Sequence, residues 1–165
     1  MAKEKFTDAI ALLKADHATV KELFEKFETA RSNKRKVAEQ ICNELKIHAM
    51  IEEEIFYPAL RGAIEDEDIL NESAVEHDGA KVLINDIMAS DAEDEYFEAK
   101  VTVLQEEILH HVKEEESDMF KQARASGVDL KALRDQLMTR KMELMEQMKT
   151  QGLPPAQMVV LQIAA

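Results

Sequence analysis

The stretch from residue 34 to residue 61 reads KRKVAEQICNELKIHAMIEEEIFYPALR. Five of its apolar residues fall in the register of one helix face: Val37, Ile41, Leu45, Ile51 and Ile55. This pattern predicts an amphipathic helix, because residues three, four and seven positions apart share one side of a helix. Pro58 is expected to kink or end that helix, and Gly62 to act as a stop after it.

Four further segments show the same helical periodicity, and none alternates with the period of a strand. The five predicted helices span approximately residues 7–30, 34–61, 71–89, 93–125 and 129–149. Short loops between the first four predict an all-α fold, an up-down-up-down four-helix bundle with an additional C-terminal helix. We expect residues 1–127 to form the bundle. Residues 128–165 would add the C-terminal helix and an apolar tail, either packed on the bundle or forming the interface of a homo-oligomer.

The excess of acidic over basic residues excludes some classes of binding partner. The 165 residues include 21 Lys and Arg against 34 Asp and Glu, a formal net charge of −13. Such an excess of acid argues against binding to nucleic acid or to an anionic membrane surface. No apolar run is long enough to span a bilayer, and the N-terminus lacks the apolar region of a signal peptide. The single cysteine, Cys42, suits a reducing compartment, so we expect a cytoplasmic protein.

Four of the five histidines lie on the apolar faces of four different predicted helices. They are His17, His48, His77 and His111. Taken alone, each is most simply interpreted as a core histidine satisfied by one hydrogen bond. Four buried imidazoles without a purpose would be costly in one small bundle, so the set favours a shared site.

Two glutamates lie on the same faces. Glu52 follows His48 by four residues and Glu115 follows His111 by four, so each lies one helical turn from its histidine. Their neighbours in the acidic runs 52–54 and 114–116 would be solvated, but a buried glutamate is rarely tolerated without a cation. Imidazole and carboxylate ligands suit Fe, Mn or Zn, and two carboxylates among four histidines fit a two-metal site.

With these residues, the chain resembles the hemerythrin-like, or HHE, family over residues 7–125. The resemblance rests on H-x₃-E at His48 and Glu52, H-x₃-E at His111 and Glu115, and lone histidines at His17 and His77. It implies two non-haem iron ions joined by an oxo or hydroxo bridge, with both glutamates bridging the ions. His17 and His48 would then serve one iron, and His77 and His111 the other.

One position departs from the oxygen-carrying members of that family, which have a further histidine where this chain has Ser73. Each iron would then keep an open position, which puts reversible O₂ carriage in doubt and favours reaction with peroxide or NO. Glu53, Glu76 and Asp78 are candidates for a replacement ligand, although none is in ideal helical phase. Tyr57 lies opposite His48 on the helical wheel and would need the distortion at Pro58 to reach the site.

The expected function is therefore a di-iron protein that binds or reacts with O₂, peroxide or nitric oxide in a redox or stress response. The alternative is a sensor or carrier of oxygen or iron without catalytic turnover. A metal-free bundle is the structural alternative to both. A ferritin-like site would use the E-x-x-H string at Glu107 and His110, but the chain has no second copy of that string. His110 is thus expected at the surface or outside the ligand set.

Overall fold

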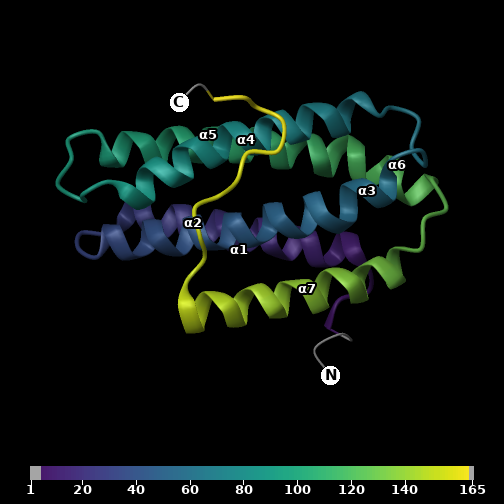
Figure 1. Cartoon of the computed structure of the whole chain (residues 1–165), viewed down its shortest axis with the longest axis horizontal. Coiled ribbons are helices and arrows are strands. Elements are labelled where there is room, and N and C mark those ends of the chain that lie inside the picture. The colour runs from purple at the N-terminus through teal and green to yellow at the C-terminus, as the bar shows by residue number, and fades with distance from the viewer. Residues whose placement is uncertain (1–4, 164–165) are drawn as a thin grey trace.

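Every regular element of the protein is helical in the computed structural model, which describes residues 5–163. Five long helices account for most of the chain (Figure 1): α1 Ala9–Thr29, α2 Lys34–Ile51, α4 Asp68–Ala89, α5 Phe97–Glu114 and α7 Leu130–Gln151. The predicted all-α class is confirmed.

Two of these helices continue through a wide turn into a short further helix. After α2, the π-helical turn η2 (Glu52–Phe56) leads into α3 (Tyr57–Leu60), and after α5, η3 (Glu115–Met119) leads into α6 (Phe120–Ala125). The amide of Tyr57 bonds to the carbonyl of Glu52, five residues back, and Phe120 bonds to Glu115 in the same way. Such insertions are rare and frequently mark functional sites. Each begins at one of the two glutamates that the sequence singles out.

The second predicted helix, over residues 34–61, corresponds to α2, η2 and α3, which end together at Leu60, and Gly62 follows with a positive φ of 79°. Two other helix boundaries differ from the prediction. Helix α4 begins at Asp68, earlier than expected, because Ile69 and Leu70 belong to its buried face.

Helix α5 begins later than expected, at Phe97 rather than near residue 93. Aspartate side chains hold the preceding residues in turns: Asp91 accepts from the amide of Glu93 and Asp94 from that of Tyr96.

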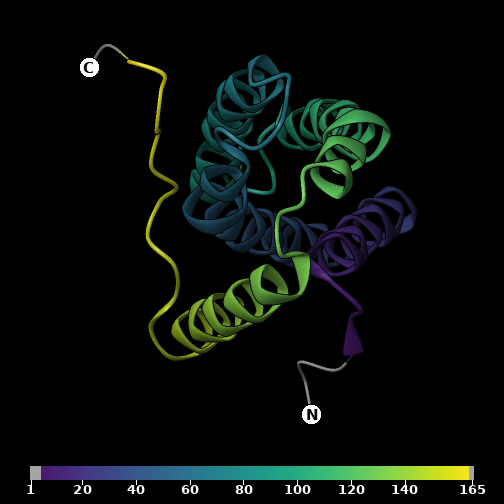
Figure 2. The same ribbon diagram turned by 90° about the vertical axis from the view of Figure 1, so that its right-hand side faces the viewer.

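Helices α1, α2, α4 and α5 surround a common centre when viewed along their length, and α7 lies outside this group (Figure 2). Helix α1 contacts α2 and α5, and α4 contacts α2 and α5. The buried apolar residues form two clusters. On α1, Leu13 belongs to one cluster and Val20 to the other, with His17 between them. On α2, Leu45 and Ile51 are divided in the same way around His48, so the polar residues form a layer between two apolar cores.

Helix α7 packs against α1 and α2. Its first turn is capped by Asp129, whose carboxylate accepts from the amides of Lys131 and Ala132. Leu137 and Leu144 are fully buried in one of the apolar clusters. Gly152, with a φ of 76°, ends the helix.

Residues 153–163, which we call the strap, contain no helix or strand and run across the outside of α2 and α4, with a bend at Val159 and Val160 (Figures 1 and 2). Asn85 pairs through its side-chain amide with both backbone groups of Ala156. No helix within residues 5–163 has the length and apolar character that crossing a membrane requires.

Candidate metal centre

The six side chains singled out from the sequence lie together in the polar layer, and all six are buried. Their donor atoms form two groups, each with atoms within 4.8 Å of one another. We call the first group, with His17 and His48, the His17 half, and the second, with His77 and His111, the His77 half. Glu52 and Glu115 belong to both halves.

Each shared glutamate divides its two oxygens between the halves. Glu52 places Oε1 2.9 Å from Nε2 of His48 and Oε2 3.2 Å from Nε2 of His77. Glu115 places Oε2 3.1 Å from Nε2 of His17 and Oε1 3.2 Å from Nε2 of His111. Both carboxylates thus lie across the two halves, as ligands that bridge two cations would.

The other ring nitrogens face a second set of carboxylates, each from the preceding helix around the centre. Asp16 of α1 lies 3.1 Å from Nδ1 of His48, Glu53 of η2 lies 2.9 Å from Nδ1 of His77, and Glu76 of α4 lies 2.6 Å from Nδ1 of His111. A longer contact of 3.7 Å joins Glu116 of η3 to Nδ1 of His17 and closes the circle.

These outer carboxylates decide which nitrogen of each ring is free to bind. A carboxylate at Nδ1 favours the tautomer with its proton there, which leaves the Nε2 lone pair directed at the centre. Three of the four contacts have hydrogen-bond distances, and the fourth, at His17, does not.

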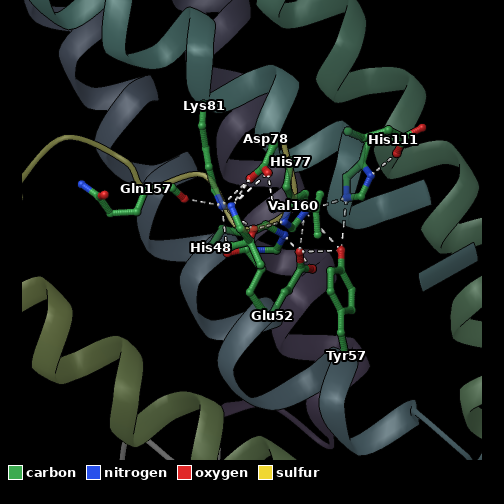
Figure 3. A network of polar contacts seen from close by, with 12 residues as sticks. His48, Glu52, Tyr57, His77, Asp78, Lys81, His111, Gln157 and Val160 are labelled. Atoms are coloured by element: carbon green, nitrogen blue, oxygen red, sulfur yellow. Dashed lines mark hydrogen bonds and ion pairs between the residues drawn. The ribbon is translucent and has the colours of Figure 1, made fainter. Parts of the chain in front are cut away.

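Tyr57 also reaches the site, which the helical wheel does not predict. Its hydroxyl lies 3.1 Å from Oε2 of Glu52 and 3.1 Å from Nε2 of His77 (Figure 3). It lies 3.4 Å from Nε2 of His111 and donates to Oε1 of Glu115. The phenol thus contacts all four donor atoms of the His77 half. The distortion that brings it there is the π-helical turn η2, which precedes Pro58 and shifts the residues after Glu52 around the helix axis.

The His17 half has no such partner. Its four donor atoms are buried: Nε2 of His17 and of His48, Oε1 of Glu52 and Oε2 of Glu115. Within residues 5–163 they approach one another, at 2.9 Å and 3.1 Å, but none of them makes a contact with hydrogen-bond geometry. Buried polar atoms without partners are costly, so four of them converging on one point indicate a ligand. Nitrogen and carboxylate donors of this kind fit a transition-metal ion.

The electrostatics of the site favour positive charge. Burial lowers the pKa of His111, but the Glu115 carboxylate and its neighbours raise it to about 10. Burial raises the pKa of Glu115, yet His111 and His17 hold it well below its usual range. Burial and the two glutamates raise the pKa of Tyr57 well above its ordinary value, so the phenol keeps its proton and donates a hydrogen bond. A cation at the centre would have to displace protons from the histidines.

The remaining candidates lie outside the two groups. Glu53 and Glu76 bind histidine Nδ1 atoms, and Asp78 accepts from the backbone of the strap. His110 is on the surface with 63% of its side chain exposed, next to Glu76 and Glu114. Glu107 is exposed as well, so the E-x-x-H string does not face the centre.

Comparison with known proteins identifies a family and a fold. The family model described as the hemerythrin HHE cation binding domain matches residues 8–123. The fold is similar to the crystal structure of a hemerythrin HHE cation binding domain-containing protein from Mycobacterium kansasii, with a TM-score of 0.75 and 22% sequence identity. The match covers 90% of this chain and 96% of that one. A search of curated proteins finds no match.

Proposed function

This chain belongs to the hemerythrin HHE cation-binding domain family, and we propose that its central side chains hold two non-haem iron ions. His17 and His48 would bind one ion and His77 and His111 the other, with Glu52 and Glu115 binding both. The observation that supports this most strongly is the division of each glutamate's oxygens between the two halves. The hydroxyl of Tyr57, which lies near both histidines of the His77 half, would occupy the space beside that ion, in the half where Ser73 replaces the histidine of oxygen carriers.

The proposed activity is reaction with O₂, peroxide or nitric oxide. Bound iron would supply exchange of electrons and coordination positions for these small molecules. The chain's own groups prepare the site: outer carboxylates hold the histidine rings in one orientation, and the two apolar cores limit access of water. Tyr57 keeps a proton within hydrogen-bond distance of Glu52, the nearest store of a proton for a reaction in the His77 half.

We also propose that the chain consists of a helical bundle followed by an appended C-terminal unit. We place an up-down-up-down four-helix bundle in residues 1–127, which the contacts of α1, α2, α4 and α5 support. Residues 128–165 would be an appended unit, since α7 packs on the outside of α1 and α2. A cytoplasmic location is also proposed, supported by the single cysteine, Cys42, which is buried and unpaired.

Two adjacent histidines provide the test. In His111→Ala we expect a loss of at least half of the bound iron, because the variant removes a donor that faces Glu115. In His110→Ala, the matched control on the same helix, the iron content should equal that of the wild type. The measurement is iron per chain after anaerobic loading with Fe²⁺ and removal of the excess. Equal iron content in the two variants would overturn the assignment.

A sensor is the second candidate, and one contact favours it. Lys141 of α7 forms an ion pair with Asp16, and Asp16 in turn holds Nδ1 of His48. A change at the His17 half is therefore connected to the C-terminal helix through two contacts. Sustained consumption of peroxide or NO over many turnovers would support an enzyme, whereas one stoichiometric spectral change would support the sensor.

A further inference from the structure

A cavity of about 360 Å³ lies between the helices and the strap. Its inner end is lined by the four central histidines, and its outer wall by residues 153–157 and Val159. A water molecule takes up roughly 30 Å³ of the liquid, and O₂, peroxide and NO are little larger. The cavity is thus several times larger than these molecules need, and falls among pockets for small organic ligands, roughly 300–1,000 Å³.

The side walls of this cavity are apolar. They include apolar residues from each of α1, α2, α4 and α5, among them Val20, Leu45, Ala80, Ile84, Ile108 and Val112. An apolar body placed between them would leave water at a gain of about 25 cal/mol per Å² of surface buried. These walls favour a molecule whose main part is hydrocarbon.

The carboxylates that line the cavity have cationic partners of their own. Asp16 pairs with Lys141, and Glu53 lies 2.7 Å from the ammonium of Lys81. Glu54 lies 2.7 Å from the guanidinium of Arg140. None of the three is left to neutralise a further cation.

Lys46 is the charged residue of the lining that lacks an opposite charge. It is only 6% exposed, and no carboxylate within residues 5–163 lies at ion-pair distance from its ammonium. Its hydrogen bond to protein is a long one, 3.4 Å to the carbonyl of Leu153 at the start of the strap. Lysine is almost never buried unless it is paired, so the ammonium of Lys46 is positioned to bind an anion.

We propose that this cavity binds an organic monocarboxylate of roughly ten non-hydrogen atoms, by comparison with the benzene that a cavity of about 150 Å³ accepts. The carboxylate pairs with the ammonium of Lys46, and the hydrocarbon lies between the apolar walls. The strap covers it and supplies Pro154 and Pro155 to the outer wall. The pairing with Lys46 uses none of the metal-binding side chains proposed above, so it can be tested separately from iron binding.

The test is isothermal titration of the full, iron-loaded chain with octanoate and with octan-1-ol, which has the same hydrocarbon but no charge. Octanoate should bind once per chain. The variant Lys46→Met keeps the aliphatic stem and removes the charge, so octanoate should bind at least about tenfold more weakly. Lys36→Met, a control at an exposed position of the same helix, should bind octanoate like the wild type.

Two further measurements separate the proposal from its alternatives. Octan-1-ol should bind the wild type and Lys46→Met with equal affinity, whereas equal losses for both probes would mean that Lys46 only anchors the strap. Ala80→Leu, which fills part of the cavity, should weaken binding of both probes. No binding of octanoate to the wild type, or an unchanged affinity in Lys46→Met, would overturn the proposal. Iron content measured in each variant distinguishes these outcomes from a failure of the metal assignment.

Discussion

The two halves of the centre use the same types of residue but differ in what faces them. In the His77 half, the hydroxyl of Tyr57 touches all four donor atoms, and both histidines have a carboxylate at hydrogen-bond distance from Nδ1. In the His17 half, the four donors lack hydrogen bonds and the contact from Glu116 to His17 is long. The donor atoms of the His77 half thus share a protein hydroxyl, whereas those of the His17 half have no hydrogen-bonded protein partner within residues 5–163 and would be satisfied by a cation.

This difference has a physical origin in the local backbone. Both glutamates begin a π-helical turn, but the turns present different residues to the centre. After η2 comes Tyr57, with a hydroxyl that reaches the donors, and after η3 comes Phe120, which stacks on the ring of His17 with centroids 5.8 Å apart. The two turns are equivalent in position, and the chemistry of one side chain makes the halves unequal.

The largest effect should come from a change that removes the feature common to both halves. In Glu115→Gln, a donor to both ions loses its charge, so affinity for both should fall by more than about 100-fold, beyond the range for outer hydrogen-bond partners. Glu106→Gln, at an exposed position of α5, is the control. The measurement is iron per chain over a titration of Fe²⁺. Retention of one tightly bound ion in Glu115→Gln would show that the carboxylate is not shared.

Variants that replace a single histidine should remove the ion of one half and leave the ion of the other half bound. His17→Ala and His77→Ala are each expected to lose about half of the iron, because each removes a donor from one half only. The remaining ion should differ between the two variants in its absorption or Mössbauer signals, since only the His77 half contains Tyr57. Identical spectra for the two remaining ions would contradict the inequality of the halves.

Tyr57→Phe should make the two halves alike, because it removes the hydroxyl that only the His77 half contains. Its effect on iron content should be smaller than that of the histidine variants. The variant loses one hydroxyl but keeps the ring that packs in the apolar core. In metal-free protein we expect the free energy of unfolding to fall by about 1–3 kcal/mol, because buried carboxylate oxygens lose their donor. Urea denaturation measures this loss. Iron bound in the His77 half should weaken by about tenfold while the other ion is unaffected, and equal weakening of both would argue against a local role.

The smallest effect on iron binding is expected for changes at the strap, which is outside both halves. Asp78 accepts hydrogen bonds from the amides of Val159, Val160 and Leu161 at 2.6–2.9 Å, and Lys81 lies 3.1 Å away. Burial raises the pKa of Asp78, but these donors bring it down to about 2. Because the pKa is lower in the folded chain, the carboxylate of Asp78 stabilises the fold fully above the pKa that aspartate has in the unfolded chain, about 3.9. This stabilisation is lost as the pH falls through about 2.

Asp78→Asn should therefore be less stable than the wild type by about 2 kcal/mol at pH 7, and this difference should shrink between pH 4 and pH 2. Asp86→Asn, at a more exposed position of α4, is the control. Denaturation at several pH values gives the free energies. A difference that stays constant down to pH 2 would show that the carboxylate does not hold the strap through its charge.

Helical phase was sufficient to predict that the six central residues would meet. His17, His48, His77 and His111 are each on the apolar stripe of a long helix, and regular helices place such residues inward. Helical phase did not place Tyr57 at the site, because a π-helical turn changes the period of the helix. The sequence does contain a hint at that position, since Pro58 directly follows Tyr57 and a regular helix loses a hydrogen bond at proline.

The outer carboxylates could have been found by a different rule. Asp16, Glu53, Glu76 and Glu116 each adjoin a central residue in the sequence. A neighbour in a helix points about 100° away, which directs it toward the next helix and its histidine. The strap, Lys46 and the Lys141 contact with Asp16 could not be predicted in this way. They depend on where residues 130–163 pack, and the amphipathic pattern of α7 does not specify which face of the other helices it covers.

Anomalous diffraction at the iron edge, from crystals of the iron-loaded chain, would locate the metal ions relative to the two halves. We expect two peaks per chain, one between His17 and His48 and the other between His77 and His111, with Glu52 and Glu115 in contact with both. A single peak, or iron only beside His110, would contradict this expectation.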